Sequence, residues 1–127
     1  MIFEEHFSTT VVGHPMADVG LFTWDIGSDK IYADSALARL FGLDPALTQR
    51  GLPIETYLDR VHPLDRPRLA KRISDAIIAE HPTEQRYRVL DASAAYRYVR
   101  AVGRCFRDDA DVPVHYAGIV FPDTNTQ

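Results

Sequence analysis

The stretch "AYRYVRAVGRCF", residues 95–106, decides the fold of this chain because small and large side chains alternate along it. An extended strand directs successive side chains to opposite faces of a sheet. One face carries small or branched side chains: Val99, Ala101, Gly103 and Cys105. The other face mixes aromatic residues, arginines and one valine: Tyr98, Arg100, Val102, Arg104 and Phe106. We expect the small face to lie beneath helices, where it leaves room for large helical side chains or for a ligand.

Two further extended runs flank this stretch. "EQRYRVL" precedes it at residues 84–90, and "VPVHYAGIVF" follows it at 112–121. The polar segments "DASA" and "RDDAD" separate the three runs and predict turns. Three extended runs joined by short turns predict an antiparallel meander.

A hairpin is expected near the N-terminus. "GLFTWDI", residues 20–26, and "KIYA", residues 30–33, are rich in aromatic and branched residues, and "GSD" joins them as a turn. With the meander they make five strands. Together with the helices expected between them, these strands predict an α+β fold, a five-stranded antiparallel sheet with helices on one face.

Helical segments are expected between the hairpin and the meander. Asp34 or Ser35 caps a first helix, because a short side-chain oxygen accepts from the free amides of the first turn, and Gly42 ends it. Residues 43–53 are predicted to be a connection, and residues 54–61 form one or two further helical turns. A longer helix with an apolar stripe then runs to the proline at position 82.

The start of that longer helix raises the question of a site at His62. Pro63 suits the first helical position, and Asp59 and Asp65 place negative charge near the positive end of the helix. No second ligand follows in the order that a metal site needs. We therefore interpret His62 as part of a helix start and predict no metal.

A short N-terminal helix is expected over residues 1–12, because Phe3, Phe7 and Val11 are spaced four apart. It forms an N-terminal helical extension, residues 1–18. Residues 19–124 form the main domain, and residues 125–127 form a tail.

Composition narrows the class of protein. The chain has 127 residues, of which 46% are apolar and 25% charged, which suits one globular domain. A net charge of -4 does not suggest nucleic-acid binding. The single cysteine excludes an internal disulfide. No apolar run approaches the length of about 20 residues that a membrane helix needs, and the acidic N-terminus is unlike a secretory signal. We expect a cytoplasmic protein with no membrane partner.

Several motifs, taken in order, resemble PAS domains, in particular the subgroup with a Trp-Asp first strand and a "VHPxDR" helix start. Here these are Trp24-Asp25 and "VHPLDR", residues 61–66. "YADSALARLFGLDP" is similar to the first helix of the family, and "HYAGIVFPDT" to its last strand and Asp-Thr end. "QRYRVLDASAAYRYVRAVG" resembles the two central strands, although the usual Asp-Gly turn is Asp91-Ala-Ser and the usual Trp is Tyr98. The resemblance covers about Val19 to Thr124.

This resemblance implies a PAS-like fold and a sensory role. Haem-binding relatives carry a histidine within the long helix, and here that helix has none between Pro63 and Glu80. Flavin-type light sensors carry a reactive cysteine in an Asn-Cys-Arg motif, which Cys105 does not match. No cofactor is therefore expected.

Two groups of residues are candidate sites. An apolar pocket for a small ligand is predicted at Leu40, Phe41, Tyr57, Ile73, Ile77, Val99, Ala101, Gly103 and Gly118. The competing interpretation is plain core packing, because such stripes usually fill one another. A protein interface is predicted at Phe3, Phe7, Val11, Tyr98, Arg100, Arg104 and Phe106, since tyrosine and arginine are enriched at interfaces.

These features predict a signalling module that acts as a homodimer or on a signalling partner such as a kinase or regulator, and that is not an enzyme. One alternative is the sensor fragment of a histidine kinase or another multidomain regulator. An alternative of a different class is a small cone-shaped isomerase or hydrolase, which would pair a buried acid with Tyr or His. The strand face expected to point inward carries no acid, which disfavours the enzyme.

Overall fold

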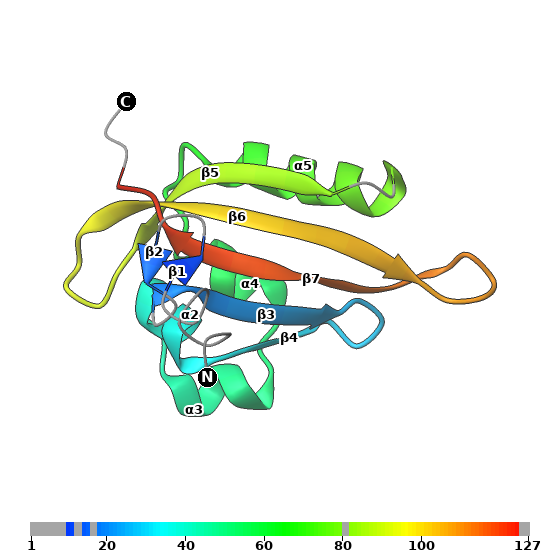
Figure 1. The fold of residues 1–127 in the computed structure, drawn as a ribbon, viewed down its shortest axis with the longest axis horizontal. Coiled ribbons are helices and arrows are strands. Elements are labelled where there is room, and N and C mark those ends of the chain that lie inside the picture. The colour runs from blue at the N-terminus through cyan, green and yellow to red at the C-terminus, as the bar shows by residue number, and fades with distance from the viewer. Residues whose placement is uncertain (1–9, 12–13, 16–17, 80–81, 125–127) are drawn as a thin grey trace, which may run out of the picture.

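The computed structural model describes residues 10–11, 14–15, 18–79 and 82–124, and this part of the chain is an α+β domain (Figure 1). Five antiparallel strands form one sheet in the order β4-β3-β7-β6-β5. The strands are β3 (Gly20–Asp25), β4 (Lys30–Ala33), β5 (Thr83–Leu90), β6 (Tyr96–Arg107) and β7 (Pro113–Pro122). The helices on one face of this sheet are α2 (Ser35–Leu40), α3 (Pro45–Arg50), α4 (Ile54–Leu58) and α5 (Arg66–Ala79). The fold class predicted from the sequence is confirmed.

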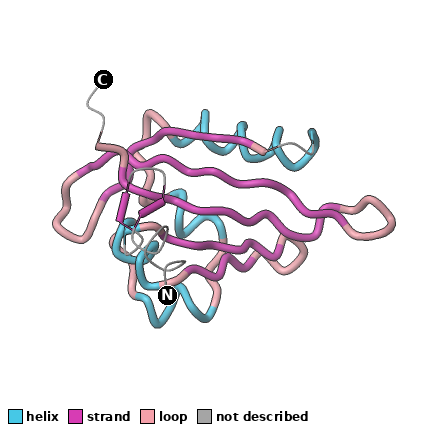
Figure 2. The backbone as a smooth tube through the Cα atoms, in the orientation of Figure 1, coloured by secondary structure: helices cyan, strands magenta, loops and turns pink. Residues whose placement is uncertain are grey.

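The meander forms the centre and one side of the sheet. Figure 2 shows β5, β6 and β7 as long strands that lie side by side. The register places Gly103 of β6 between Thr83 of β5 and Gly118 of β7. The small side chains of β6 therefore lie on the helix-covered face, and Val99 and Cys105 are buried there.

The connection before α5 closes the outer edge of β5. The His62 N–H donates to the Arg88 carbonyl at 2.9 Å, and the Leu90 N–H donates to the Arg60 carbonyl at 2.7 Å. Asp65 accepts the Arg88 backbone N–H at 2.9 Å. Unpaired edges of sheets promote aggregation, so these contacts protect an otherwise open strand.

His62 takes part in the turn that begins α5. Its Nδ1 accepts the Leu64 N–H at 3.1 Å, and its carbonyl accepts the N–H groups of Asp65 and Arg66. Its ring lies against that of Tyr96, with 4.6 Å between the ring centroids. These contacts agree with the interpretation of His62 as part of a helix start.

The predicted connection over residues 43–53 contains a helix, α3, which the sequence interpretation missed. Asp44 caps this helix by accepting the Ala46 N–H at 2.9 Å, and Pro45 occupies its first turn. Both signals are present in the sequence. The helix has only six residues and buries Thr48, so it has no apolar stripe that would mark it.

The helix predicted over residues 1–12 is wrong at Thr10–Val11. These two residues form β1, which pairs antiparallel with β2 (His14–Pro15). Both are β-branched, and such residues favour extended backbone over helix. Phe3 and Phe7 lie outside the described residues.

The core lies between the sheet and the helices. Its main cluster joins α2, α4 and α5 to the inner sheet face, with Leu37, Val61, Val89 and Val99 almost fully buried. A second cluster, Ala76, Cys105 and Tyr116, lies under the later part of α5. Within the described ranges, no helix has the length and apolar character needed to cross a bilayer.

Candidate functional site

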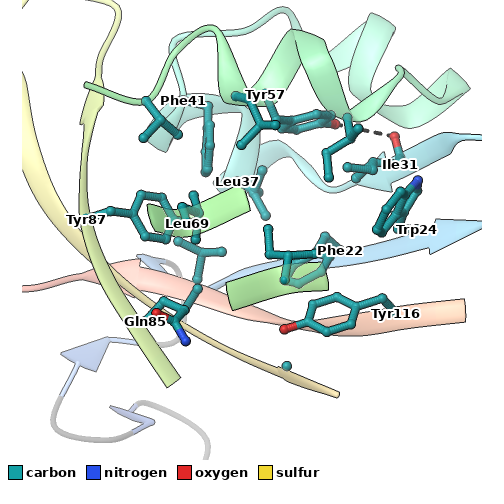
Figure 3. Close-up of a pocket in the computed structure, with 17 residues that line it drawn as sticks. Phe22, Trp24, Ile31, Leu37, Phe41, Tyr57, Leu69, Gln85, Tyr87 and Tyr116 are labelled. Carbon is teal, nitrogen blue, oxygen red and sulfur yellow. Dashed lines mark hydrogen bonds between the residues drawn. The ribbon is translucent and has the colours of Figure 1, made fainter. Parts of the chain in front are cut away.

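A cavity of about 80 Å³ lies between the helices and the inner face of the sheet (Figure 3). Its lining consists of Phe22, Trp24, Ile31, Leu37, Phe41, Ile54, Tyr57, Leu58, Val61, Leu69, Ile73, Gln85, Tyr87, Ala101, Gly103, Tyr116 and Val120. This set includes no acidic residue, lysine, arginine or histidine. The cavity is therefore a neutral, mostly apolar site.

The small residues of β6 create the space for this cavity. Gln85 of β5 is opposite Ala101 in the sheet, and the Tyr116 ring of β7 reaches over Gly103. A Cβ atom on Gly103 would lie 2.9 Å from Tyr116 Cε1, so a larger residue there would displace the ring. Figure 3 shows Gln85 and Tyr116 on one side of the cavity and Phe41 and Tyr57 on the other.

Three polar side chains at the wall have partners inside the protein. The Tyr116 and Thr83 hydroxyls form a hydrogen bond of 2.8 Å. The Trp24 indole N–H donates to Asp29 at 3.0 Å, and the Tyr57 hydroxyl donates to the Ile31 carbonyl at 3.4 Å. These groups are largely satisfied by the fold itself.

Gln85 and Tyr87 differ from them. Gln85 is 7% exposed and Tyr87 is also buried, and both side chains line the cavity from β5. Among the described residues, neither the Gln85 carboxamide nor the Tyr87 hydroxyl has a hydrogen-bond partner. Both side chains border the space of the cavity, which makes their polar groups the points of the wall that are open to a ligand.

Burial keeps the tyrosines at the wall neutral. It raises the pKa of Tyr57 to about 12. Burial, with a smaller contribution from the Tyr116 side chain, raises the pKa of Tyr87 further. The pKa of Tyr116 is also raised by burial. The wall therefore offers hydroxyl groups as hydrogen-bond donors and acceptors but no negative charge near neutral pH.

The predicted pocket coincides with the cavity in part. Phe41, Tyr57, Ile73, Ala101 and Gly103 line it. The other four predicted residues, Leu40, Ile77, Val99 and Gly118, are not part of its lining.

These four residues have packing roles instead. Leu40 and Val99 belong to the filled core, and Ile77 packs on the cluster that contains Cys105. A Cβ atom on Gly118 would lie 2.0 Å from the Val102 carbonyl oxygen, so this glycine allows β6 and β7 to approach each other.

The sequence interpretation missed the lining that comes from β3 and β5. Phe22 and Trp24 alternate with exposed residues on β3, and the buried Gln85 and Tyr87 alternate with exposed or partly buried residues on β5. The two-residue period was visible in "GLFTWD" and "TEQRYRVL". Extending the alternation of β6 to these neighbouring strands would have placed all four on the inner face.

The outer face of the sheet carries the described part of the predicted interface. Tyr98 and Phe106 are exposed on β6, and arginines cover both rings. The Arg86 guanidinium lies 3.6 Å from the Tyr98 ring centroid, and that of Arg104 lies 4.5 Å from the Phe106 centroid. Val11 is on β1, whose side chains are outside the description.

Arg100 takes part in an ion-pair network on this face. It pairs with Glu84 at 2.6 Å and with Asp123 at 3.1 Å. Arg86 also binds Asp123, at 2.6 Å. Asp123 follows β7 directly, so this network ties the end of the last strand to β5 and β6.

In the described part of the chain, no group of three or more histidine, cysteine or acidic side chains is arranged to hold a metal ion. Cys105, the single cysteine of the chain, is buried on the inner sheet face. The site is thus a neutral cavity on one side of β6 and an aromatic and arginine-rich surface on the other.

The sequence pattern of the PAS fold matches residues 30–120 of this chain. The match covers more than half of the chain, which therefore belongs to the PAS fold family, as its motifs indicated. No protein of curated function matches the chain.

Many solved structures share the fold, and three of them illustrate it. The N-terminal domain of a diguanylate cyclase with PAS/PAC sensor from Marinobacter aquaeolei has a TM-score of 0.73 at 19% identity, over 82% of this chain and 94% of that one. A sensory box histidine kinase/response regulator from Burkholderia thailandensis has a TM-score of 0.72 at 19% identity, over 85% and 79%. A domain named for a light and redox sensing histidine kinase from Haloarcula marismortui has a TM-score of 0.71 at 22% identity, over 97% of each chain.

Proposed function

We propose that this chain is a sensory module that signals through contact with another protein, and that a small ligand in the cavity modulates this contact. One observation carries the proposal: the cavity wall and the outer face share strand β6. Ala101 and Gly103 border the cavity, while Val102 between them faces outward. A ligand that favours one arrangement of β6 shifts the population of that arrangement. The outer face presents this shift to a partner.

A second copy of the chain is the partner that we propose for the outer face. Leu21 of β3 lies opposite Ile119 of β7, which lies opposite Val102 of β6. These residues form an apolar line across three strands, and Leu21 is 58% exposed. An interface between identical surfaces would bury this line. A kinase or other regulator that binds the same face is the alternative, in keeping with the kinases and cyclase named above.

Sedimentation velocity of matched leucine variants tests this interface. Leu21→Glu places a charge on the outer face, whereas Leu64→Glu places it at the start of α5, where Leu64 is 76% exposed. We expect the wild type and Leu64→Glu to dimerise alike and Leu21→Glu to dimerise at least tenfold more weakly, because the charge would be buried. A monomeric wild type, or equal effects of the two variants, would contradict the homodimer.

The lining of the cavity favours binding over catalysis. Small α+β enzymes pair a buried acid with a tyrosine or histidine, and this lining contains neither an acid nor a histidine. We therefore treat the cavity as a binding site. An absorption spectrum and native mass spectrometry of the purified chain would report a bound chromophore or small molecule.

A further inference from the structure

Two buried polar groups specify the kind of ligand that suits the cavity. Gln85 is 7% exposed as a residue, its side chain lines the cavity, and its carboxamide has no hydrogen-bond partner among the described residues. The Tyr87 hydroxyl, two residues along the same strand, is in the same situation. The Trp24, Tyr57 and Tyr116 polar groups already have partners in the protein. The polar groups of the lining that are open to a ligand therefore both lie on β5.

We infer that the cavity takes a small neutral molecule with an apolar body and one hydroxyl or carbonyl group, which Gln85 and Tyr87 bind. This inference rests on the proposed function, since it names the ligand class of the same site. The carboxamide offers two donors and an acceptor, and the tyrosine hydroxyl offers one donor and an acceptor. A single hydroxyl group of the ligand can donate to one of them and accept from the other.

Other ligand classes fit less well. A charged molecule would enter a wall with no ionised partner and would lose its hydration. A purely apolar molecule would leave Gln85 and Tyr87 unpaired. The small volume of about 80 Å³ also favours a ligand of few heavy atoms.

Isobutanol and isopentane are suitable probes because they differ only by a hydroxyl in place of a methyl group. Each would be titrated into the wild type and into Gln85→Met by two-dimensional NMR of the full chain. Methionine keeps the approximate shape of glutamine and removes the amide. We expect this substitution to weaken isobutanol binding about tenfold, the equivalent of one hydrogen bond, and to leave isopentane binding unchanged or tighter.

The unliganded stability of the same variant separates ligand binding from a structural role. Since Gln85 has no partner in the protein, Gln85→Met should raise the melting temperature of the unliganded domain. Tyr87→Phe removes only a hydroxyl and provides a second variant, for which we expect a similar loss of isobutanol affinity.

The outcomes distinguish the two levels of the proposal. Isobutanol affinity that stays unchanged in both variants would overturn the inference, while binding of either probe would keep the cavity as a ligand site. A lower melting temperature of Gln85→Met with unchanged isobutanol affinity would mean that Gln85 holds only ordered water, and would also overturn it. Absence of binding by both probes to the wild type would overturn the inference and the ligand part of the proposed function together.

Discussion

Asp65 connects the start of α5 to the edge strand β5 through a single carboxylate. Its Oδ1 accepts from Arg88 Nη2 at 2.8 Å, and its Oδ2 accepts from Arg88 Nε and the Arg88 backbone N–H, both at 2.9 Å. The side-chain hydrogen bond from Arg88 is the main reason that the pKa of Asp65 is lowered to about 2. The motif "HPLDR" thus combines a helix start with a buried link to the sheet.

This pair should make stability depend on pH in the acid range. The pKa of Asp65 is lower in the folded chain than its ordinary value of 3.8, so the contribution is complete above that value and is lost as the pH falls through about 2. The shift corresponds to about 2 kcal/mol. We expect Asp65→Asn to lose about this much unfolding free energy at pH 7, and less as the pH falls from 5 toward 2, in urea denaturation.

A matched control for this variant lies on the exposed side of α5. Lys71 and Asp75 form an ion pair of 2.9 Å between well-exposed side chains. Such surface pairs contribute little, so Asp75→Asn should change the unfolding free energy by less than about 0.5 kcal/mol. Equal effects of the two substitutions would show that the Asp65–Arg88 link contributes no more than a surface pair.

At the scale of elements, the sequence predicted the parts with strong periodicity. The period-two pattern of β6 and the caps at Asp34 and Gly42 placed the meander and α2, and Asp34 does accept the Leu37 N–H at 3.0 Å. The sequence failed for α3, which is too short for an apolar stripe, and at Thr10–Val11, where β-branching outweighs the spacing of apolar residues. The cavity was predicted only in part, because its lining depends on how β3 and β5 align with β6.

A substitution at Gly118 tests how closely β6 and β7 approach each other. A Cβ atom at this position would lie 2.0 Å from the Val102 carbonyl oxygen and 2.7 Å from Gly103 Cα, and backbone cannot move aside easily. We expect Gly118→Ala to lose about 3 kcal/mol in chemical denaturation. Gly27→Ala is the control, since its nearest atom would be Asp25 Oδ1 at an ordinary 3.7 Å. A loss for Gly118→Ala as small as that of Gly27→Ala would contradict this close approach.

At the scale of the whole molecule, the sheet separates two surfaces with different chemistry. Its inner face borders the neutral cavity, and its outer face carries exposed apolar and arginine side chains. In β6, Ala101 and Gly103 border the cavity, and Val102 between them lies on the outer face. Under the proposed function, a change in cavity occupancy would act on the same strand that presents Tyr98 and Phe106.

If the cavity ligand modulates dimerisation, the two equilibria must be linked in both directions. We expect saturating isobutanol to change the dimer dissociation constant at least about fivefold, the lower end of typical coupling between sites. The isobutanol dissociation constant should then be measured at two protein concentrations, one well below and one well above the dimer dissociation constant. Since coupling is reciprocal, the two values should differ by the same factor. Sedimentation velocity measures the change in the dimer dissociation constant, and NMR titration measures the change in the isobutanol dissociation constant. Leu21→Glu is the control: because it should dimerise weakly, its isobutanol affinity should not depend on protein concentration. Ligand binding that leaves the dimer unchanged would mean that β6 does not connect the two surfaces energetically.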